Sequence, residues 1–296
     1  MHRRILRLVI GVAAVAAMSQ AAIPAYAATP YYLFEAAQAA SLLTPDAPPP
    51  GANDWSCHPS AGHPRPVVLI HGTFANALSS WGRISAELKN NGYCVFALDY
   101  GGAAGNPVKA TAHIPDSAAE LASYVDSVLT ATGAAKVDLV GYSQGGGVMP
   151  RWYLAFDGGA AKVGRLVGIS PSNHGTTLDG LGLLANALGL DVSLLAGPAA
   201  QDQLVGSEVN QTLDAQGDTR PGVAYTTIVS RLDEVVTPYQ NQYLTAGPGA
   251  TVTNYTLQNF CPLDLSDHLH TPYDPAAVAL TLNALDPAHP RTVSCL

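Results

Sequence analysis

Short apolar runs rich in Val, Ile and Leu recur along the chain and predict buried strands. Residues 66–70 and 94–98 are apolar throughout, which is typical of strands covered on both faces in a parallel sheet. The predicted strands span residues 66–70, 94–98, 137–140, 163–169, 225–229 and 252–257.

Segments with helical periodicity separate these strands. Apolar residues recur at helical spacing over residues 81–88, and again from Leu121 to Leu129. The pattern Ser117-Ala-Ala-Glu120 resembles a capping box and predicts that the second of these helices begins there. Residues 275–285 predict a closing helix that starts at a proline. Strands that alternate with helices predict an α/β fold with a mostly parallel central sheet and helices on both faces.

Two segments depart from this alternation. Residues 28–54 contain Pro30 and the run Pro48-Pro49-Pro50, which predict an extended N-terminal arm. Residues 178–218 are rich in Leu, Gly and Ala near their start and favour helix. This second segment packs against the core or forms a small helical cap over a site, and its sequence leaves both alternatives open. No second alternation restarts, so residues 28–296 predict a single domain.

The first 27 residues have the pattern of a secretory signal peptide. Three arginines lie within residues 1–7, and residues 8–18 form an uncharged apolar run. Ala25-Tyr26-Ala27 then matches a small-x-small cleavage site. The apolar run is too short to span about 30 Å of hydrocarbon. We therefore expect a secreted, extracellular protein without a stable membrane anchor.

The charge balance argues against a nucleic-acid partner. The chain has 14 Lys and Arg against 22 Asp and Glu, a net charge of −8. Removal of Arg3, Arg4 and Arg7 with the signal peptide would bring the charge to −11. Nucleic-acid binding needs clustered cations to neutralise phosphates. We expect no nucleic-acid partner, and we expect a monomer.

Four cysteines predict two disulfide bonds in an oxidising compartment. Cys57 lies before the predicted strand at residues 66–70, and Cys94 begins the next predicted strand. Cys261 and Cys295 both lie in the last 36 residues. This organisation favours the pairs Cys57–Cys94 and Cys261–Cys295. No Cys or His spacing typical of zinc occurs, so we expect no metal.

Gly141-Tyr-Ser143-Gln-Gly145 has the form G-x-S-x-G. It follows a predicted strand directly and precedes a helix-like run, which is the strand–turn–helix context of a nucleophile elbow. The pattern predicts that Ser143 is a nucleophile. Upstream, the strand that ends at His71-Gly72 leads to Thr73. The backbone amides of Thr73 and Gln144 are the expected oxyanion donors.

An acid and a histidine should follow the serine in chain order. Asp233 and Glu234 come directly after a predicted strand, and either carboxylate could orient the histidine. Asp264 and Asp267 lie too near the histidines in sequence to come from a separate strand end. His268 and His270 both follow the next strand, and their positions barely separate them.

These motifs resemble those of the secreted bacterial class 2 lipases and esterases of the α/β-hydrolase superfamily. The chain is also similar, more distantly, to the fungal lipase B group. The matching pieces are Val68-Leu-Ile-His-Gly-Thr-Phe-Ala-Asn76, Gly141-Tyr-Ser-Gln-Gly-Gly146, Met149-Pro-Arg151, Pro171-Ser-Asn-His-Gly-Thr176, Asp233-Glu-Val-Val-Thr-Pro238, Cys261-Pro262 and Asp267-His268. Some relatives carry a cysteine near residues 199–202, where this chain has Ala-Ala-Gln-Asp.

The resemblance implies specific roles at the matched positions. Ser143 would be the nucleophile, Asp233 the acid and His268 the base, with Thr73 and Gln144 as oxyanion donors. It implies a serine carboxylic-ester hydrolase, a triacylglycerol lipase or esterase, that needs no cofactor and takes acyl-ester or lipid substrates. A cutinase-like polyester hydrolase and an acyltransferase that uses the same triad are the alternatives. A non-catalytic binder would lack a triad member, and none is missing.

Overall fold

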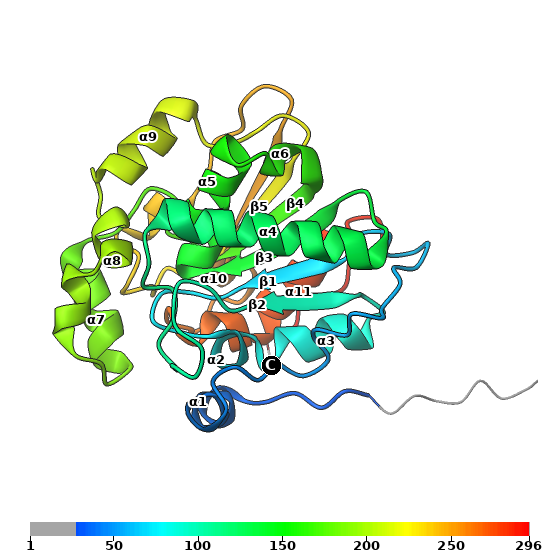
Figure 1. The fold of residues 1–296 in the computed structure, drawn as a ribbon, viewed down its shortest axis with the longest axis horizontal. Helices are drawn as coiled ribbons and strands as arrows, with labels where there is room; N and C mark the ends of the chain where they lie inside the picture. The colour runs from blue at the N-terminus through cyan, green and yellow to red at the C-terminus, as the bar shows by residue number, and fades with distance from the viewer. Residues whose placement is uncertain (1–27, 296) are drawn as a thin grey trace, which may run out of the picture.

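The computed structural model describes residues 28–295 (Figure 1). The predicted signal peptide lies outside the described residues. Among the residues that are described, no helix is long and apolar enough to cross a membrane.

The strands of residues 28–295 form one six-stranded, parallel sheet with the order β2-β1-β3-β4-β5-β6. Each observed strand lies within about two residues of its predicted position. The strands are β1 (Val67–Ile70), β2 (Val95–Leu98), β3 (Val137–Tyr142), β4 (Val163–Ile169), β5 (Ala224–Val229) and β6 (Thr251–Thr256). Because all strands run in the same direction, the loops after β1, β3 and β5 leave the sheet at one edge.

Helices cover both faces of the sheet, as the alternation predicted (Figure 1). The α-helices are α1 (Phe34–Leu43), α2 (Ala77–Trp81), α3 (Ile84–Asn90), α4 (Ile114–Thr132), α5 (Val148–Phe156), α6 (Gly159–Lys162), α7 (Leu178–Ala187), α8 (Pro198–Asp202), α9 (Glu208–Gln216), α10 (Leu257–Phe260) and α11 (Pro275–Leu285). The structure therefore has the α/β architecture that the sequence predicted, with a parallel sheet between two layers of helices.

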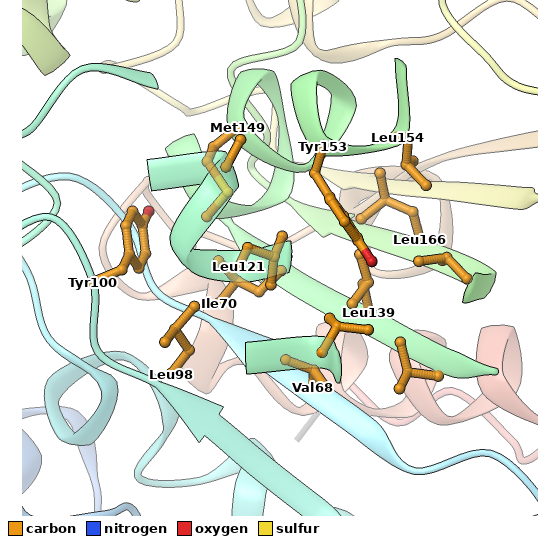
Figure 2. Packing of buried hydrophobic residues seen from close by; sticks show 14 of the residues in the cluster. Val68, Ile70, Leu98, Tyr100, Leu121, Leu139, Met149, Tyr153, Leu154 and Leu166 are labelled. Atoms are coloured by element: carbon orange, nitrogen blue, oxygen red, sulfur yellow. The ribbon is translucent and has the colours of Figure 1, made fainter. Parts of the chain in front are cut away.

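Side chains of β1 divide between two apolar clusters because successive residues of a strand point to opposite faces. Val68 and Ile70 pack with residues of α4 and α5 on one face, in a cluster that includes Leu121 of α4 and Met149 of α5 (Figure 2). Val67 and Leu69 pack on the other face with residues of α2, α3 and α11. All four β1 side chains are fully buried, so the strand that leads to Thr73 is held rigidly from both sides.

The predicted start of α4 at a Ser117 capping box is wrong. The helix begins at Ile114, and Ser117 is a fully buried residue of its second turn. The Asp202 carboxylate of α8 accepts the backbone N–H of Ile114 at 2.8 Å and lies 2.9 Å from His113 Nδ1. The amide groups of the first helical turn therefore obtain a partner from a distant segment. Glu120 instead lies within hydrogen-bond distance of the Gly101 amide.

The N-terminal arm is not extended throughout, because residues Phe34–Leu43 form helix α1. Four of these ten residues are alanine, the strongest helix former. Ala37 and Ser41 form the buried side of α1, and Gln38 Nε2 donates to the carbonyl oxygen of Ser79 at 3.1 Å. The arm is therefore a packed element that lies against α2.

Residues 178–218 are helical, as expected, and contain α7, α8 and α9. Leu181, Leu184 and Ala200 of this segment are buried in an apolar cluster with Phe74 and Val235. Phe74 follows β1 and Val235 follows β5. The segment thus packs on the loops at the edge of the sheet where the predicted site residues lie.

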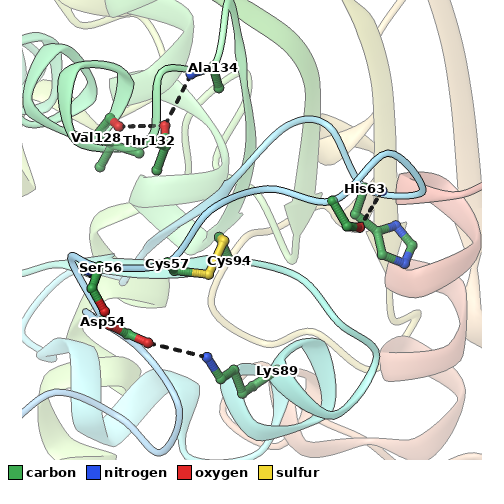
Figure 3. The surroundings of a disulfide bond; sticks show 10 residues. Asp54, Ser56, Cys57, His63, Lys89, Cys94, Val128, Thr132 and Ala134 are labelled. Carbon is green, nitrogen blue, oxygen red and sulfur yellow. Dashed lines mark hydrogen bonds and ion pairs between the residues drawn. A yellow bond between two sulfur atoms is a disulfide. The ribbon is translucent and has the colours of Figure 1, made fainter.

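Both predicted disulfide pairs are present. Cys57 bonds to Cys94, which joins the segment before β1 to the residue before β2 (Figure 3). Nearby, Lys89 Nζ lies 3.7 Å from Asp54 Oδ2 and adds an ion pair between the same two regions. Cys261 bonds to Cys295, which fastens the C-terminal segment to the start of the loop that carries His268.

Candidate active site

Ser143 lies on a sharp turn between β3 and α5. Its φ angle is +54°, a left-handed conformation that is unfavourable for a serine. A Cβ atom on Gly141 would lie 1.8 Å from the carbonyl oxygen of Gly145, and a Cβ atom on Gly145 would lie 2.3 Å from that of His71. Only glycine fits at both positions, so the G-x-S-x-G spacing follows from the tightness of the turn.

The structure brings Ser143, His268 and Asp233 together from three separate loops. His268 Nε2 lies 3.0 Å from Ser143 Oγ, and His268 Nδ1 lies 2.8 Å from Asp233 Oδ2. The side chains of His268 and Asp233 are fully buried. The imidazole can therefore take a proton from the serine hydroxyl while the carboxylate holds its other nitrogen.

Four donors surround the Asp233 carboxylate. Oδ1 accepts the backbone N–H groups of Val235 and Val236 at 2.9 and 2.8 Å. Oδ2 accepts Gln242 Nε2 at 3.0 Å in addition to the His268 ring. These four hydrogen bonds hold the carboxylate in one orientation.

Glu234, the other candidate acid, makes a different contact with the same histidine. Its Oε2 accepts the backbone N–H of His268 at 3.2 Å, so it holds the main chain and not the imidazole ring. The two adjacent carboxylates therefore act on different parts of His268, a division that the sequence order could not reveal.

The remaining candidates lie outside this relay. The half-exposed His270 ring pairs with Asp267 at 2.7 Å and lies against the Phe34 ring at a tilt, with ring centroids 4.5 Å apart. Asp264 accepts the backbone N–H of Ser266 at 2.7 Å. His270, Asp267 and Asp264 thus organise the loop that presents His268.

The side chains of the two expected oxyanion residues are joined in a buried network with Gln203, which directly follows α8, and with Ser172 of the β4–α7 loop. Thr73 Oγ1 donates to Gln144 Oε1 at 2.8 Å, so the two residues lie side by side. Gln203 Nε2 donates to Thr73 Oγ1 at 2.8 Å, and Gln203 Oε1 accepts from Ser172 Oγ at 3.1 Å. We call these four residues the oxyanion network. Sequence reasoning missed Gln203 and Ser172 because nothing local links them to Thr73.

His71 supports the turn that leads to Thr73. Its ring is fully buried, stacks on Tyr100 with centroids 4.4 Å apart, and has Nδ1 2.9 Å from the Gly72 carbonyl oxygen. Tyr100 Oη donates to the carbonyl oxygen of His71 at 2.8 Å. Burial lowers the pKa of His71, although Asp99 opposes this shift. A neutral His71 therefore acts as a packing residue at the end of β1.

Among the described residues, His174, Asp214 and Asp218 come closest to a set of metal ligands, with ligand atoms within 4.8 Å of one another. The buried Arg151 guanidinium lies 3.3 Å from Asp218 and 3.9 Å from Asp214. The hydrogen bond to Asp218 raises the pKa of His174. Two cationic partners thus already balance the carboxylates, and the group is an ion-pair cluster that joins α5 to α9.

Comparison with known proteins identifies the family to which these motifs belong. A family model described as "Lipase (class 2)" matches residues 64–279. Triacylglycerol lipases from Pseudarthrobacter phenanthrenivorans and Burkholderia plantarii are each 38% identical over 87 residues, or 27% of this chain. Those alignments cover 25% and 23% of the two relatives, so this chain matches about a quarter of their length.

Solved structures share the fold at low sequence identity. Aspergillus fumigatus lipase B superposes with a TM-score of 0.63 at 22% identity, over 83% of this chain and 56% of that chain. Bacillus licheniformis lipase BlEst2 in its mature form gives 0.55 at 20% identity, over 78% of this chain and 94% of that one. These likenesses establish an α/β-hydrolase fold.

Proposed function

Because the chain belongs to the class 2 lipase family, we propose that it is a secreted carboxylic-ester hydrolase that acts through Ser143, His268 and Asp233. The observation that carries this proposal is the continuous buried relay from Ser143 Oγ through the imidazole to Asp233. The lipase names of the curated relatives, of which this chain matches about a quarter, support an ester or triacylglycerol substrate.

The proposed reaction begins when His268 Nε2 takes the proton of Ser143 as its oxygen attacks the ester carbonyl carbon. The backbone amides of Thr73 and Gln144 stabilise the oxyanion of the tetrahedral intermediate. The intermediate collapses, His268 protonates the departing alcohol, and an acyl-enzyme remains on Ser143. Water, activated by the same histidine, then attacks the acyl carbon and releases the carboxylic acid.

Asp233 has two roles in this proposal. Its Oδ2 accepts a hydrogen bond from the Nδ1–H group of His268, which keeps Nε2 unprotonated and directed at Ser143. It also stabilises the imidazolium that forms after each proton transfer. The two backbone N–H groups on Oδ1 fix the carboxylate for both tasks.

An apolar setting beside the relay favours a lipid-like substrate. Phe74 directly follows Thr73, and it packs with Leu181, Leu184 and Val235 in one buried cluster. An aliphatic ester group can therefore approach the site without the cost of desolvating a charge.

A substrate panel tests the proposed function. The purified protein is assayed on p-nitrophenyl esters with acyl chains from two to sixteen carbons, on triolein and on a solid polyester. We expect hydrolysis of soluble esters and of triolein, with free acid as the product even when a competing alcohol is present. Transfer of the acyl group mainly to the alcohol would instead establish an acyltransferase, and no turnover of any ester would refute the proposal.

A further inference from the structure

Two neighbouring cavities that share several lining residues lie beside the oxyanion network. The inner one is a narrow space of about 20 Å³ that touches Thr73 and Tyr142, the residue before Ser143. The outer one has a volume of about 220 Å³ and extends between α1 and α7. We call the two together the α1–α7 chamber. Residues that line both parts are Phe34, Gln38, Ala75, Ser79, Leu188 and Leu269.

One wall of the chamber is a face of α1. Phe34, Gln38 and Leu42 recur every four residues, so they lie on the same side of the helix. Gln38 is fixed to the carbonyl oxygen of Ser79, and the Phe34 ring lies edge-on to Tyr273 with centroids 5.5 Å apart. The unexpected helix in the N-terminal arm is therefore a fixed wall.

The opposite wall belongs to α7 and the residues that follow it. Ala187, Leu188 and Leu190 line the outer part of the chamber. Leu269, which directly follows His268, lines both parts. The chamber thus begins beside the relay and continues outward between two helices.

The lining determines what the chamber can bind. Among the described residues, no Asp, Glu, Lys or Arg lines either cavity. A charged ligand would lose its hydration without gaining an ionic partner, whereas a hydrocarbon chain would lose only water contact. The chamber therefore suits an uncharged aliphatic group.

We propose that the α1–α7 chamber binds a hydrocarbon chain of the ester substrate and that Leu42 of α1 limits the length of chain accepted. This inference rests on the proposed esterase function. An ester carries an acyl chain and an alkoxy chain, and both can be aliphatic. Separate series of acyl and alkyl lengths identify which of the two chains occupies the chamber.

Leu42→Trp places an indole at the chamber wall, and Leu43→Trp is its matched control. Leu42 is 67% exposed and Leu43 is 83% exposed, so neither position is tightly packed, yet only Leu42 lines the chamber. Each variant is assayed on p-nitrophenyl esters of increasing acyl length and on alkyl acetates of increasing alkyl length. The measured quantity is the ratio of kcat/KM for the longest ester to that for the shortest.

We expect Leu42→Trp to lower this ratio about tenfold or more in one series, because each misfitted methylene changes kcat/KM by about tenfold or more. Leu43→Trp should leave the ratio within about twofold of wild type. A fall in the acyl series assigns the acyl chain to the chamber, and a fall in the alkyl series assigns the alkoxy chain. An unchanged ratio in both series for Leu42→Trp overturns the inference.

A second pair of variants narrows the chamber from the other side. Ala187 is exposed and lines the chamber, whereas its exposed neighbour Asn186 does not. Ala187→Trp should shift the same series in the same direction as Leu42→Trp, and Asn186→Trp should not. If Leu42→Trp lowers the ratio in one series and Ala187→Trp lowers it in the other, α1 and α7 line different binding sites, and the inference of a single chamber is overturned.

A binding measurement separates this inference from the proposed function. If the wild type hydrolyses no ester, the proposed function fails, and the chamber is tested with 1-decanol as a hydrocarbon probe. The fluorescence emission of each variant is compared with that of wild type as decanol is added. The tryptophan added in Leu42→Trp should contribute a blue shift that wild type lacks, and the tryptophan added in Leu43→Trp should not. The absence of a difference between the two variants would refute a hydrocarbon site at α1.

Discussion

Replacement of Asp233 by asparagine should inactivate the protein with little loss of structure. Both carboxylate oxygens accept hydrogen bonds, two from fixed backbone amides on Oδ1 and two from Gln242 and His268 on Oδ2. The NH₂ group of asparagine must replace one of these oxygens. On the Oδ1 side the NH₂ group would face two backbone N–H groups, which cannot become hydrogen-bond acceptors. Each buried donor left without a partner would lower the free energy of unfolding by about 1–3 kcal/mol.

The NH₂ group is better accommodated on the Oδ2 side. There Gln242 can rotate its amide and present Oε1, a buried atom that has no hydrogen-bond partner among the described residues. His268 can likewise accept at Nδ1 if its proton moves to Nε2. That tautomer directs an N–H at Ser143 and cannot take the serine proton, so kcat should fall about 10⁴-fold.

Glu234→Gln is the matched control, because it also replaces a carboxylate next to His268 by an amide. Glutamine retains an oxygen that can accept the backbone N–H of His268, now 3.2 Å from Glu234 Oε2. We expect kcat within about tenfold of wild type, since only the charge on one hydrogen bond changes. Both variants are assayed on a short soluble ester, with thermal unfolding measured in parallel. A larger loss of kcat in Glu234→Gln than in Asp233→Asn would refute the assignment of Asp233 as the acid.

Three further predictions concern the surroundings of the relay. Gln203→Ala removes the donor to Thr73 and should lower kcat about tenfold or more at nearly unchanged KM, within the roughly 10²–10³-fold limit for the loss of an oxyanion donor. Gln201→Ala, on an exposed residue two positions earlier in α8, should leave kcat nearly unchanged, and equal kcat in the two variants would contradict a positioning role for Gln203. The raised pKa of His174 means that its protonated form stabilises the fold, so this contribution is complete below the unfolded-state pKa of about 6.5 and is lost as pH rises through the folded-state pKa. Thermal unfolding of wild type and His174→Gln should therefore differ most at low pH and converge at high pH, and a difference that grows with pH would contradict this. Replacement of Cys261 and Cys295 by serine opens a loop with a sequence separation of 34 and should cost about 3–4 kcal/mol of unfolding free energy, measured by denaturant titration; an unchanged midpoint would show that the bond adds no stability.

The sheet and the elbow could be predicted from the sequence because their causes are local. A run such as Val67–Ile70 is apolar at every position, and the turn at Ser143 requires small neighbours at fixed spacing. These features are expressed in consecutive residues. For the same reason, each strand was predicted within about two residues of its observed bounds.

Features that depend on distant partners could not be predicted. The start of α4 at Ile114 depends on the hydrogen bond that the Ile114 amide donates to Asp202, which is 88 residues away. Gln203 reaches Thr73 across 130 residues, so no local pattern marks its role. Helix α1 was missed for a different reason, because the prolines around it outweighed four alanines in the interpretation of residues 28–54.

The central claim is that Ser143 is the nucleophile of an ester hydrolase, and covalent labelling tests it most directly. The protein is treated with a fluorophosphonate, digested and analysed by mass spectrometry, and Ser143→Ala is assayed for ester hydrolysis at the same concentration. We predict a single adduct on the peptide that contains Ser143, no adduct in the variant, and a fall in kcat of about 10⁴-fold or more. An adduct on another residue, or hydrolysis by Ser143→Ala within tenfold of wild type, would contradict the account.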